Sequence, residues 1–114
     1  IIALNYSSRD EIVRAVRKII SQGFDATLIN QQIIEHNLDT AGVPDPDLII
    51  RTSGEMRLSN FLLWQAAYAE LYFTETLWPE FTIEEFDDAL AVFGGRERRF
   101  GKTSEQVKQK NIEN

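Results

Sequence analysis

The sequence predicts an α/β fold, in which short buried strands alternate with amphipathic helices. Apolar runs with strand character lie at residues 1–4, 48–50 and 71–73. Helix-start signals lie at Ser8 and Thr82, and a further cap candidate is Asn30. The 114 residues suffice for one domain, and the elements alternate without an internal repeat.

The first half of the chain is expected to contain one strand and two helices. Ile1–Leu4 reads as a buried strand, and Ser8 with Glu11 forms a capping-box pair that opens a helix. The spacing of apolar residues gives that helix one buried face, made of Ile12, Val16, Ile19 and Ile20. A loop through Gly23 then leads to a shorter helix that begins at the cap residue Asn30.

The middle of the chain is expected to contain two more strands with a helix between them. Leu48–Ile50 follows a turn rich in proline and aspartate, so it reads as a short buried strand. Phe61–Tyr68 is almost wholly apolar, which predicts a buried helix. Leu71–Phe73 has strand character because of its aromatic residues.

The last predicted helix begins at a second capping box, made by Thr82 and Glu85, and ends at Gly94–Gly95. Its inward-facing residues are expected to be Phe86, Leu90 and Phe93. Residues 102–114 are polar and bury too little apolar surface to offset the entropy of ordering, which predicts a disordered tail.

Composition excludes several classes of protein. A net charge of −6 disfavours nucleic-acid binding, which needs a basic face. The chain has no cysteine, so it has neither disulfides nor a cysteine-based metal site, and no apolar run reaches the roughly 18 residues that span a bilayer. The one histidine, His36, lies on a predicted surface helix and is interpreted as structural. We therefore expect a soluble, cytoplasmic protein.

The segment after Leu48–Ile50 has the composition of an anion pocket. Ligands of α/β sheets bind beyond the carboxyl ends of the strands, where Arg51 would lie. Gly54 permits a tight turn, and Arg57 adds a second planar cation. Ser59 and the asparagine after it could open a helix whose free N–H groups point at the anion. Together these features predict a diphosphate site.

Three stretches of the sequence resemble the cis-prenyltransferases, typified by undecaprenyl diphosphate synthase. They are Asp47–Gln65, Ala69–Phe73 and Leu77–Phe81, and the resemblance extends from Ala3 to Gly101. It implies a parallel central sheet flanked by helices, of which this chain is the C-terminal portion. Residues 1–101 are accordingly expected to be the C-terminal half of a cis-prenyltransferase domain.

The resemblance also implies an activity. Enzymes of this family are transferases that condense isopentenyl diphosphate with an allylic diphosphate, such as farnesyl diphosphate, to make a long-chain cis-polyprenyl diphosphate such as undecaprenyl diphosphate. They use Mg²⁺ and are homodimers. Peripheral membrane contact through the lipid product is also expected.

Site residues follow from matching this sequence to the family's motifs. Arg51, Arg57 and Ser59 match the positions that bind isopentenyl diphosphate, and Glu70 matches an acidic position tied to metal or substrate. Arg99 and Gly101 match an Arg-x-Gly motif that reaches the substrate in the partner's site. The main catalytic acid is expected in the N-terminal half, which this sequence lacks.

Two other functions stay open at this point. One is a non-catalytic accessory subunit of a heteromeric cis-prenyltransferase, although such subunits lack the complete loop found at residues 51–59. The other is a diphosphate-binding domain without chemistry.

Ser7–Ser8 stands where the family usually has two glycines, and serine there adds a capping oxygen. The aromatic residues near Pro79 are expected to form the dimer interface.

Overall fold

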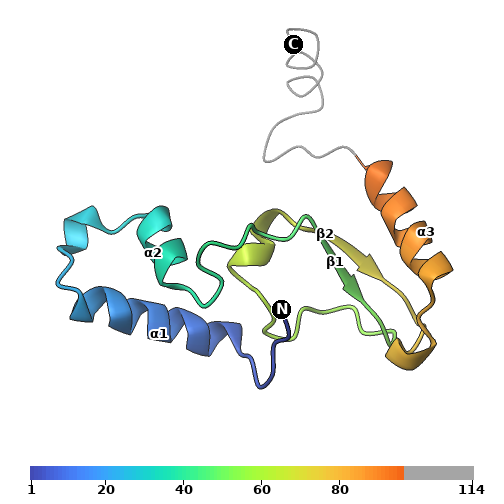
Figure 1. The fold of residues 1–114 in the computed structure, drawn as a ribbon, viewed down its shortest axis with the longest axis horizontal. Coiled ribbons are helices and arrows are strands. Elements are labelled where there is room, and N and C mark those ends of the chain that lie inside the picture. Colours follow the sequence, from blue (N-terminus) through green and yellow to red (C-terminus); the bar gives the residue numbers. More distant parts are fainter. Residues whose placement is uncertain (97–114) are drawn as a thin grey trace, which may run out of the picture. The chain divides into compact units, whose positions relative to one another are not determined.

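The computed structural model describes residues 1–96 of the chain (Figure 1). These residues form two compact units. The first unit consists of Ile1–Asp47 and Arg57–Ala69, and the second consists of Leu48–Met56 and the described residues from Glu70 onward. Residues 102–114, for which the sequence predicts a disordered tail, lie outside the described range.

The second unit contains the sheet. Strand β1 (Leu48–Arg51) pairs with β2 (Glu70–Phe73) in parallel, with Leu48 opposite Glu70 and Arg51 opposite Phe73 (Figure 1). Both predicted strands are confirmed, and each is one residue longer than expected. Their side chains are half-buried rather than fully buried. The predicted parallel α/β arrangement is therefore present in this unit.

Helix α3 (Ile83–Gly94) packs against β2 and begins at the predicted capping box. The Thr82 hydroxyl accepts the Glu85 N–H at 3.3 Å, and the Glu85 carboxylate accepts the Thr82 N–H at 3.2 Å. The predicted inward face is wrong in part, because Phe86 and Leu90 are exposed and Ala89 is fully buried. The two described strands offer too little area to cover a face of large side chains, so Phe86 and Leu90 stay exposed.

Helix α1 (Ser8–Ser21) and helix α2 (Gln31–Asn37) pack together in the first unit. Asn30 caps α2 as predicted, through a hydrogen bond from the Ile33 N–H at 3.0 Å. The predicted cap of α1 is off by one residue, because Ser7 rather than Ser8 accepts from the first turn. The Ser8 hydroxyl instead accepts the Leu63 N–H at 3.0 Å.

The buried face of α1 also differs from the predicted one. Of the four predicted apolar residues only Ile19 is buried, while Val16 and Ile20 are exposed. The buried stripe has helical spacing and consists of Ser8, Glu11, Ala15 and Ile19. Counting apolar residues cannot identify this stripe, because two of its members, Ser8 and Glu11, are polar. Their burial depends on hydrogen-bond partners elsewhere in the chain.

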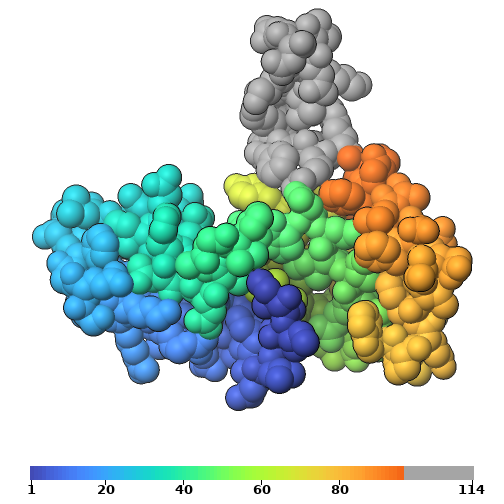
Figure 2. All heavy atoms as spheres, in the orientation of Figure 1, coloured from blue at the N-terminus to red at the C-terminus, as the bar shows by residue number. Residues whose placement is uncertain are grey.

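Residues 1–4 do not form the predicted strand. Ile1, Ile2 and Leu4 are at least 85% exposed, and the N-terminal residues lie at the surface in Figure 2. A strand forms only by hydrogen bonding to a neighbouring strand. Within residues 1–96 the sheet contains β1 and β2 alone, so Ile1–Leu4 has no strand partner.

The predicted helix at Phe61–Tyr68 is wrong as well. Ser59, Asn60 and Leu62 have φ angles of 49°, 64° and 49°, which lie in the left-handed region and exclude a right-handed helix there. Only Gln65–Tyr68 forms a short 3₁₀ turn, in which Gln65 is the buried residue. Tyr68 is exposed, so the apolar segment is not a buried core helix.

Asn60 explains why this segment leaves the helical path. Its backbone carbonyl accepts the Ser8 N–H at 2.9 Å, and its side-chain oxygen accepts the Arg9 N–H at 3.0 Å. Its side-chain amide donates to the Ser7 hydroxyl at 2.8 Å. The first N–H groups of a helix have no acceptor within the helix. Asn60 supplies acceptors for two of them in α1, those of Ser8 and Arg9.

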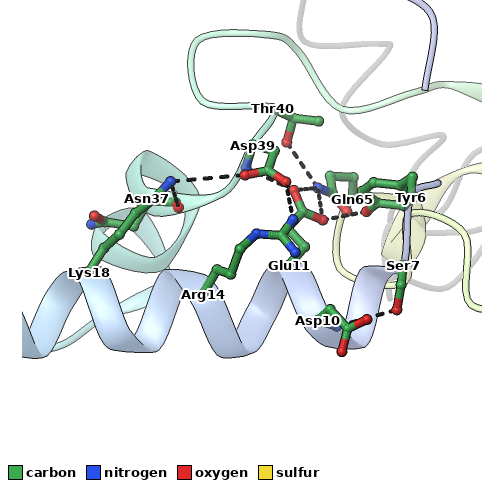
Figure 3. Close-up of polar contacts among 10 residues, drawn as sticks. All are labelled: Tyr6, Ser7, Asp10, Glu11, Arg14, Lys18, Asn37, Asp39, Thr40 and Gln65. Carbon is green, nitrogen blue, oxygen red and sulfur yellow. Dashed lines mark hydrogen bonds and ion pairs between the residues drawn. The ribbon is translucent and has the colours of Figure 1, made fainter. Parts of the chain in front are cut away.

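A buried polar cluster centred on Glu11 joins α1 to the rest of the first unit (Figure 3). The Glu11 carboxylate accepts the Asp39 N–H at 2.8 Å and the Gln65 amide at 3.2 Å, and it accepts the Tyr6 hydroxyl. The same Gln65 amide donates to Thr40 at 2.9 Å. A buried carboxylate needs such donors, because burial without them is strongly unfavourable.

Tyr6 stays a donor in this cluster. Burial of the ring, together with the Glu11 carboxylate beside the hydroxyl, raises the pKa of Tyr6 above its ordinary value. The phenol is therefore protonated throughout the neutral range, and its O–H bond to Glu11 persists there. Near the cluster, Arg14 pairs with Asp39 on the surface.

Replacing Glu11 tests whether the cluster stabilises the fold. Glu11→Ala leaves the Asp39 N–H, the Gln65 amide and the Tyr6 hydroxyl without their acceptor, so the free energy of unfolding should fall by about 3 kcal/mol. Asp10→Ala is the matched control, since Asp10 is an exposed acid in the same helical turn and should lose at most about 1 kcal/mol. Urea unfolding of the intact protein measures both. Equal losses would contradict the role assigned to Glu11.

Candidate functional site

Arg51 ends β1 at the carboxyl edge of the strand pair, as the sequence predicts. Its carbonyl accepts the Thr74 N–H at 3.0 Å, so backbone pairing continues one residue beyond the end of β2. The side chain is half-buried. Arg51 therefore lies on a fixed backbone at the edge where parallel sheets bind ligands.

A tight turn at residues 52–54 follows Arg51. Ser53 and Gly54 both have a φ of 71°, in the left-handed region. The Ser53 N–H donates to the Thr76 carbonyl and the Gly54 N–H to the Thr74 carbonyl, each at 2.9 Å. The turn predicted at Gly54 is present, but these two N–H groups bind the loop after β2 and are not directed at a ligand.

The space beside Gly54 is open. A methyl group added there would meet no heavy atom within 4 Å. The sequence predicts that glycine lets a ligand approach the backbone at this position, and the structure leaves room for such an approach.

Arg57 and Ser59 belong to the first unit, whereas Arg51 belongs to the second. Residues 52–56 connect them along the chain. Arg57 and Ser59 are both exposed. The helix expected to open at Ser59 is absent, so the anion-binding N–H groups predicted from it are absent too. Side chains, not a helix terminus, would have to bind an anion here.

Glu70 lies at the opposite end of the strand pair from Arg51. It pairs with Leu48 in the sheet register, three residues before the pair made by Arg51 and Phe73. Three residues of strand correspond to about 10 Å. The Glu70 carboxylate accepts from the Arg96 guanidinium at 2.8 Å, and the same nitrogen donates to the Leu71 carbonyl at 3.0 Å.

These contacts bear on the predicted magnesium site. Among residues 1–96 no group of three or more histidine, cysteine, aspartate or glutamate side chains is arranged to hold a metal ion. Glu70 offers one carboxylate, which already binds a guanidinium. A magnesium ion prefers several oxygen ligands in octahedral geometry, so the described residues do not fit a site of their own for it.

Three residues that hold Glu70 and the turn at residues 52–54 were not singled out as site residues in the sequence. Arg96 pairs with Glu70. Thr76 and Glu85 hold the loop that binds Ser53 and Gly54. The capping-box pattern gave the position of Glu85 in α3, although not its bond to Thr76. Arg99 and Gly101, predicted to act in a partner's site, lie outside the described residues.

His36 is exposed on α2, and its ring contacts its own helix. Its Nδ1 atom lies 2.6 Å from the Gln32 carbonyl, one turn earlier in α2. No helix within residues 1–96 is long and apolar enough to span a membrane.

Comparison with known proteins gives the family. A family model described as putative undecaprenyl diphosphate synthase matches residues 1–101. The chain belongs to the cis-prenyltransferase family. A relative in Acinetobacter baylyi, named ditrans,polycis-undecaprenyl-diphosphate synthase ((2E,6E)-farnesyl-diphosphate specific), is 57% identical over 99% of this chain. The resemblance seen in the sequence is therefore confirmed.

Solved structures of cis-prenyltransferases share the fold of this chain. A probable undecaprenyl diphosphate synthase from Campylobacter jejuni matches 88% of the chain with a TM-score of 0.77 and 45% identity. Lavandulyl diphosphate synthase from Lavandula x intermedia, in complex with dimethylallyl diphosphate, matches 88% with a TM-score of 0.83 and 42% identity. The chain spans 46% and 45% of those two chains, and 47% of the Acinetobacter relative.

The left-handed turn beside Arg51 can be tested by substitution. Gly54→Ala has room for its methyl group but must keep a φ of 71°, so it should lower the free energy of unfolding by about 1–2 kcal/mol. Gly94→Ala is the matched control: it too meets no neighbour, and a helical alanine should be neutral or stabilising by up to about 1 kcal/mol. Thermal unfolding gives both values. The turn assignment fails if the two substitutions shift stability in the same direction.

Proposed function

We propose that the cis-prenyltransferase containing this chain condenses isopentenyl diphosphate with an allylic diphosphate, farnesyl diphosphate or similar, to make a long-chain cis-polyprenyl diphosphate such as undecaprenyl diphosphate. The observation that carries the proposal is Arg51 at the carboxyl edge of β1, beside a turn with open space at Gly54. The printed name of the Acinetobacter relative, which includes specificity for farnesyl diphosphate, supports it. Because the chain spans less than half of that relative, the activity is proposed for the complete enzyme.

In this proposal Arg51, Arg57 and Ser59 bind the diphosphate of isopentenyl diphosphate. Two guanidinium groups offer paired N–H donors that match diphosphate oxygens, and the serine hydroxyl adds a third donor. Charge-assisted bonds of this kind fix the homoallylic substrate by its polar end. Its alkene is then free to react with the allylic partner.

The reaction balances without a redox step. The allylic C–O bond breaks, and the diphosphate leaves with its electron pair. The π electrons of isopentenyl diphosphate form the new C–C bond to the allylic carbon, which leaves a positive charge on the other alkene carbon. Loss of a proton from the carbon next to that charge gives the new cis double bond. Arg51, Arg57 and Ser59 hold the attacking substrate in place, and proximity of this kind lowers the barrier. Magnesium and the metal-binding role of Glu70 stay predictions for the complete enzyme.

A non-catalytic accessory subunit is the alternative. Against it, the loop is complete, with Arg51, Gly54, Glu55, Arg57 and Ser59 all present. A diphosphate-binding domain without chemistry is a further alternative. An assay of the complete enzyme with isopentenyl diphosphate and either farnesyl or dimethylallyl diphosphate separates these possibilities, since neither alternative forms a longer prenyl product.

We further propose a cytoplasmic homodimer that contacts the membrane through its lipid product. The exposed Trp78 ring stacks on Phe81, with centroids 6.3 Å apart and planes 13° from parallel. An aromatic pair with one ring exposed to solvent is typical of protein interfaces. In such a dimer Arg99 and Gly101 of one subunit would contribute to the site of the other.

Arginine substitutions test the binding role. In the complete enzyme, Arg51→Ala or Arg57→Ala removes charge-assisted bonds worth about 1.5–3 kcal/mol each. The Michaelis constant for isopentenyl diphosphate should rise, or turnover fall, by roughly ten- to hundredfold, with the affinity for farnesyl diphosphate nearly unchanged. Arg51→Lys should recover only part of the loss, because it keeps the charge without the planar fork. Arg17→Ala, on the exposed face of α1, serves as the control.

Equal weakening of both substrates by Arg51→Ala would show that the site is assigned to the wrong substrate. A loss of the same size in Arg17→Ala would show that the effect comes from total charge and not from the loop.

Mixed dimers test the role of Arg99. If each site takes Arg51 from one subunit and Arg99 from the other, a dimer of Arg51→Ala with Arg99→Ala has one intact site. Random remixing of equal amounts makes about half of the dimers mixed, so activity should return to roughly a quarter of wild type. The assay is incorporation of labelled isopentenyl diphosphate after dissociation and reassociation. No recovery, with subunit exchange verified by a tagged chain, means that Arg99 serves its own subunit.

A further inference from the structure

We propose that Thr76 and Glu85 are positioning residues for Arg51. They lie in the loop after β2 and in the first turn of α3, and they fix the backbone of the turn at residues 52–54. The inference rests on the proposed function, because it assigns these two residues to the isopentenyl diphosphate site. Neither residue is assigned a contact with the substrate. The bond between Thr76 and Glu85 holds the loop whose carbonyls accept from the turn after Arg51.

Three backbone hydrogen bonds connect the loops that follow the two strands. The Thr74 N–H donates to the Arg51 carbonyl at 3.0 Å, and the Gly54 N–H donates to the Thr74 carbonyl at 2.9 Å. The Ser53 N–H donates to the Thr76 carbonyl, also at 2.9 Å. The two loops therefore continue the pairing of β1 and β2 beyond the sheet. The position of Arg51 depends on the conformation of residues 74–76 as well as on its own strand.

The loop at residues 74–76 is in turn fixed to α3. The Thr74 hydroxyl donates to the Thr76 hydroxyl at 3.2 Å, and the Thr76 hydroxyl donates to Oε1 of Glu85. The other carboxylate oxygen of Glu85, Oε2, accepts the Thr82 N–H at 3.2 Å. One oxygen of Glu85 thus completes the cap of α3, while the other holds the loop. Thr76 and Glu85 are both half-buried, so the bond between them is partly shielded from water.

The turn needs this support because its backbone is strained. Ser53 has a φ of 71° with a side chain present, a conformation that only glycine adopts without cost. Residues in such regions keep their conformation only where the surroundings determine it. Here the carbonyls of Thr76 and Thr74 keep the turn in its conformation by accepting the N–H groups of Ser53 and Gly54. The bond from Thr76 to Glu85 in turn holds the loop that contains both carbonyls.

The chain offers variants that separate positioning from helix stability. Thr76→Val removes the hydroxyl while keeping the β-branched shape, and Thr76→Ser restores the hydroxyl. Glu85→Gln keeps acceptor oxygen for the cap, and Glu85→Ala removes both contacts. Thr82→Ala is the matched control, because it removes the side-chain cap of α3 but leaves Thr76 bonded to Glu85.

Steady-state kinetics of the complete enzyme provide the first measurement. Displacement of a positioned group by 1 Å can cost about a hundredfold, so a partial loosening in Thr76→Val should raise the Michaelis constant for isopentenyl diphosphate by about tenfold. The constant for farnesyl diphosphate should stay within about twofold of wild type. Thr76→Ser should restore the wild-type constant, and Thr82→Ala should leave it unchanged within about twofold although it lowers stability.

Amide exchange provides a second measurement that does not depend on activity. Deuterium uptake at Ser53 and Gly54 should be faster by about tenfold in Thr76→Val and Glu85→Ala than in wild type or Thr82→Ala. Unchanged exchange in Thr76→Val overturns the inference, and so does an unchanged Michaelis constant in an active enzyme. If wild type itself fails to elongate a prenyl diphosphate, the proposed function is wrong, and the exchange result still decides whether Thr76 and Glu85 hold the turn.

Discussion

The parallel pairing of β1 with β2 is the interaction on which the candidate site depends. Its register sets Arg51 opposite Phe73 at the carboxyl edge, and the backbone bonds continue from there into both following loops. The carboxyl ends of two parallel strands lie at the same edge of the sheet, so the loops that follow β1 and β2 are neighbours. The same register puts Glu70 at the other edge, where its partner is Arg96. The parallel pairing therefore places Arg51 and Glu70 at opposite ends of the strand pair.

The first unit is organised by a different constraint, which is the need to satisfy buried polar groups. Glu11 is fully buried, and its carboxylate is surrounded by donors from three separate segments. Asn60 meets the same need at the start of α1, where it accepts two backbone N–H groups. Asn60 and Gln65 both bond to residues at the start of α1, and Leu62 between them has a left-handed φ of 49°. Contacts with α1 therefore hold both ends of the segment that follows Ser59.

Local signals in the sequence predicted two helix starts that depend on local contacts. The capping box at Thr82 and Glu85 and the cap at Asn30 are both confirmed. The strands at residues 48–50 and 71–73 are confirmed as well, because each has the other as its partner. Two other apolar segments were predicted wrongly. Ile1–Leu4 has the composition of a strand, yet composition does not supply a neighbouring strand. Residues 61–68 have the composition of a buried helix, but the bonds of Asn60 decide their path.

The candidate site was predictable in part for the same reason. The position of Arg51 follows from a strand that can be recognised in the sequence, and the family follows from the motifs around that strand. The positions of Thr76 and Glu85 beneath the turn follow from contacts between residues that are 20 or more positions away along the chain from Ser53 and Gly54. No spacing rule connects such residues. Their role becomes visible only when the loops after both strands are seen together.

The most direct test of this account is a crystal structure of the complete enzyme with isopentenyl diphosphate bound. We expect the diphosphate to accept hydrogen bonds from the Arg51 guanidinium, with Ser53 and Gly54 still in left-handed conformations and still bonded to the carbonyls of Thr76 and Thr74. A diphosphate bound away from the carboxyl edge of β1, or a turn that breaks those bonds on binding, would contradict it.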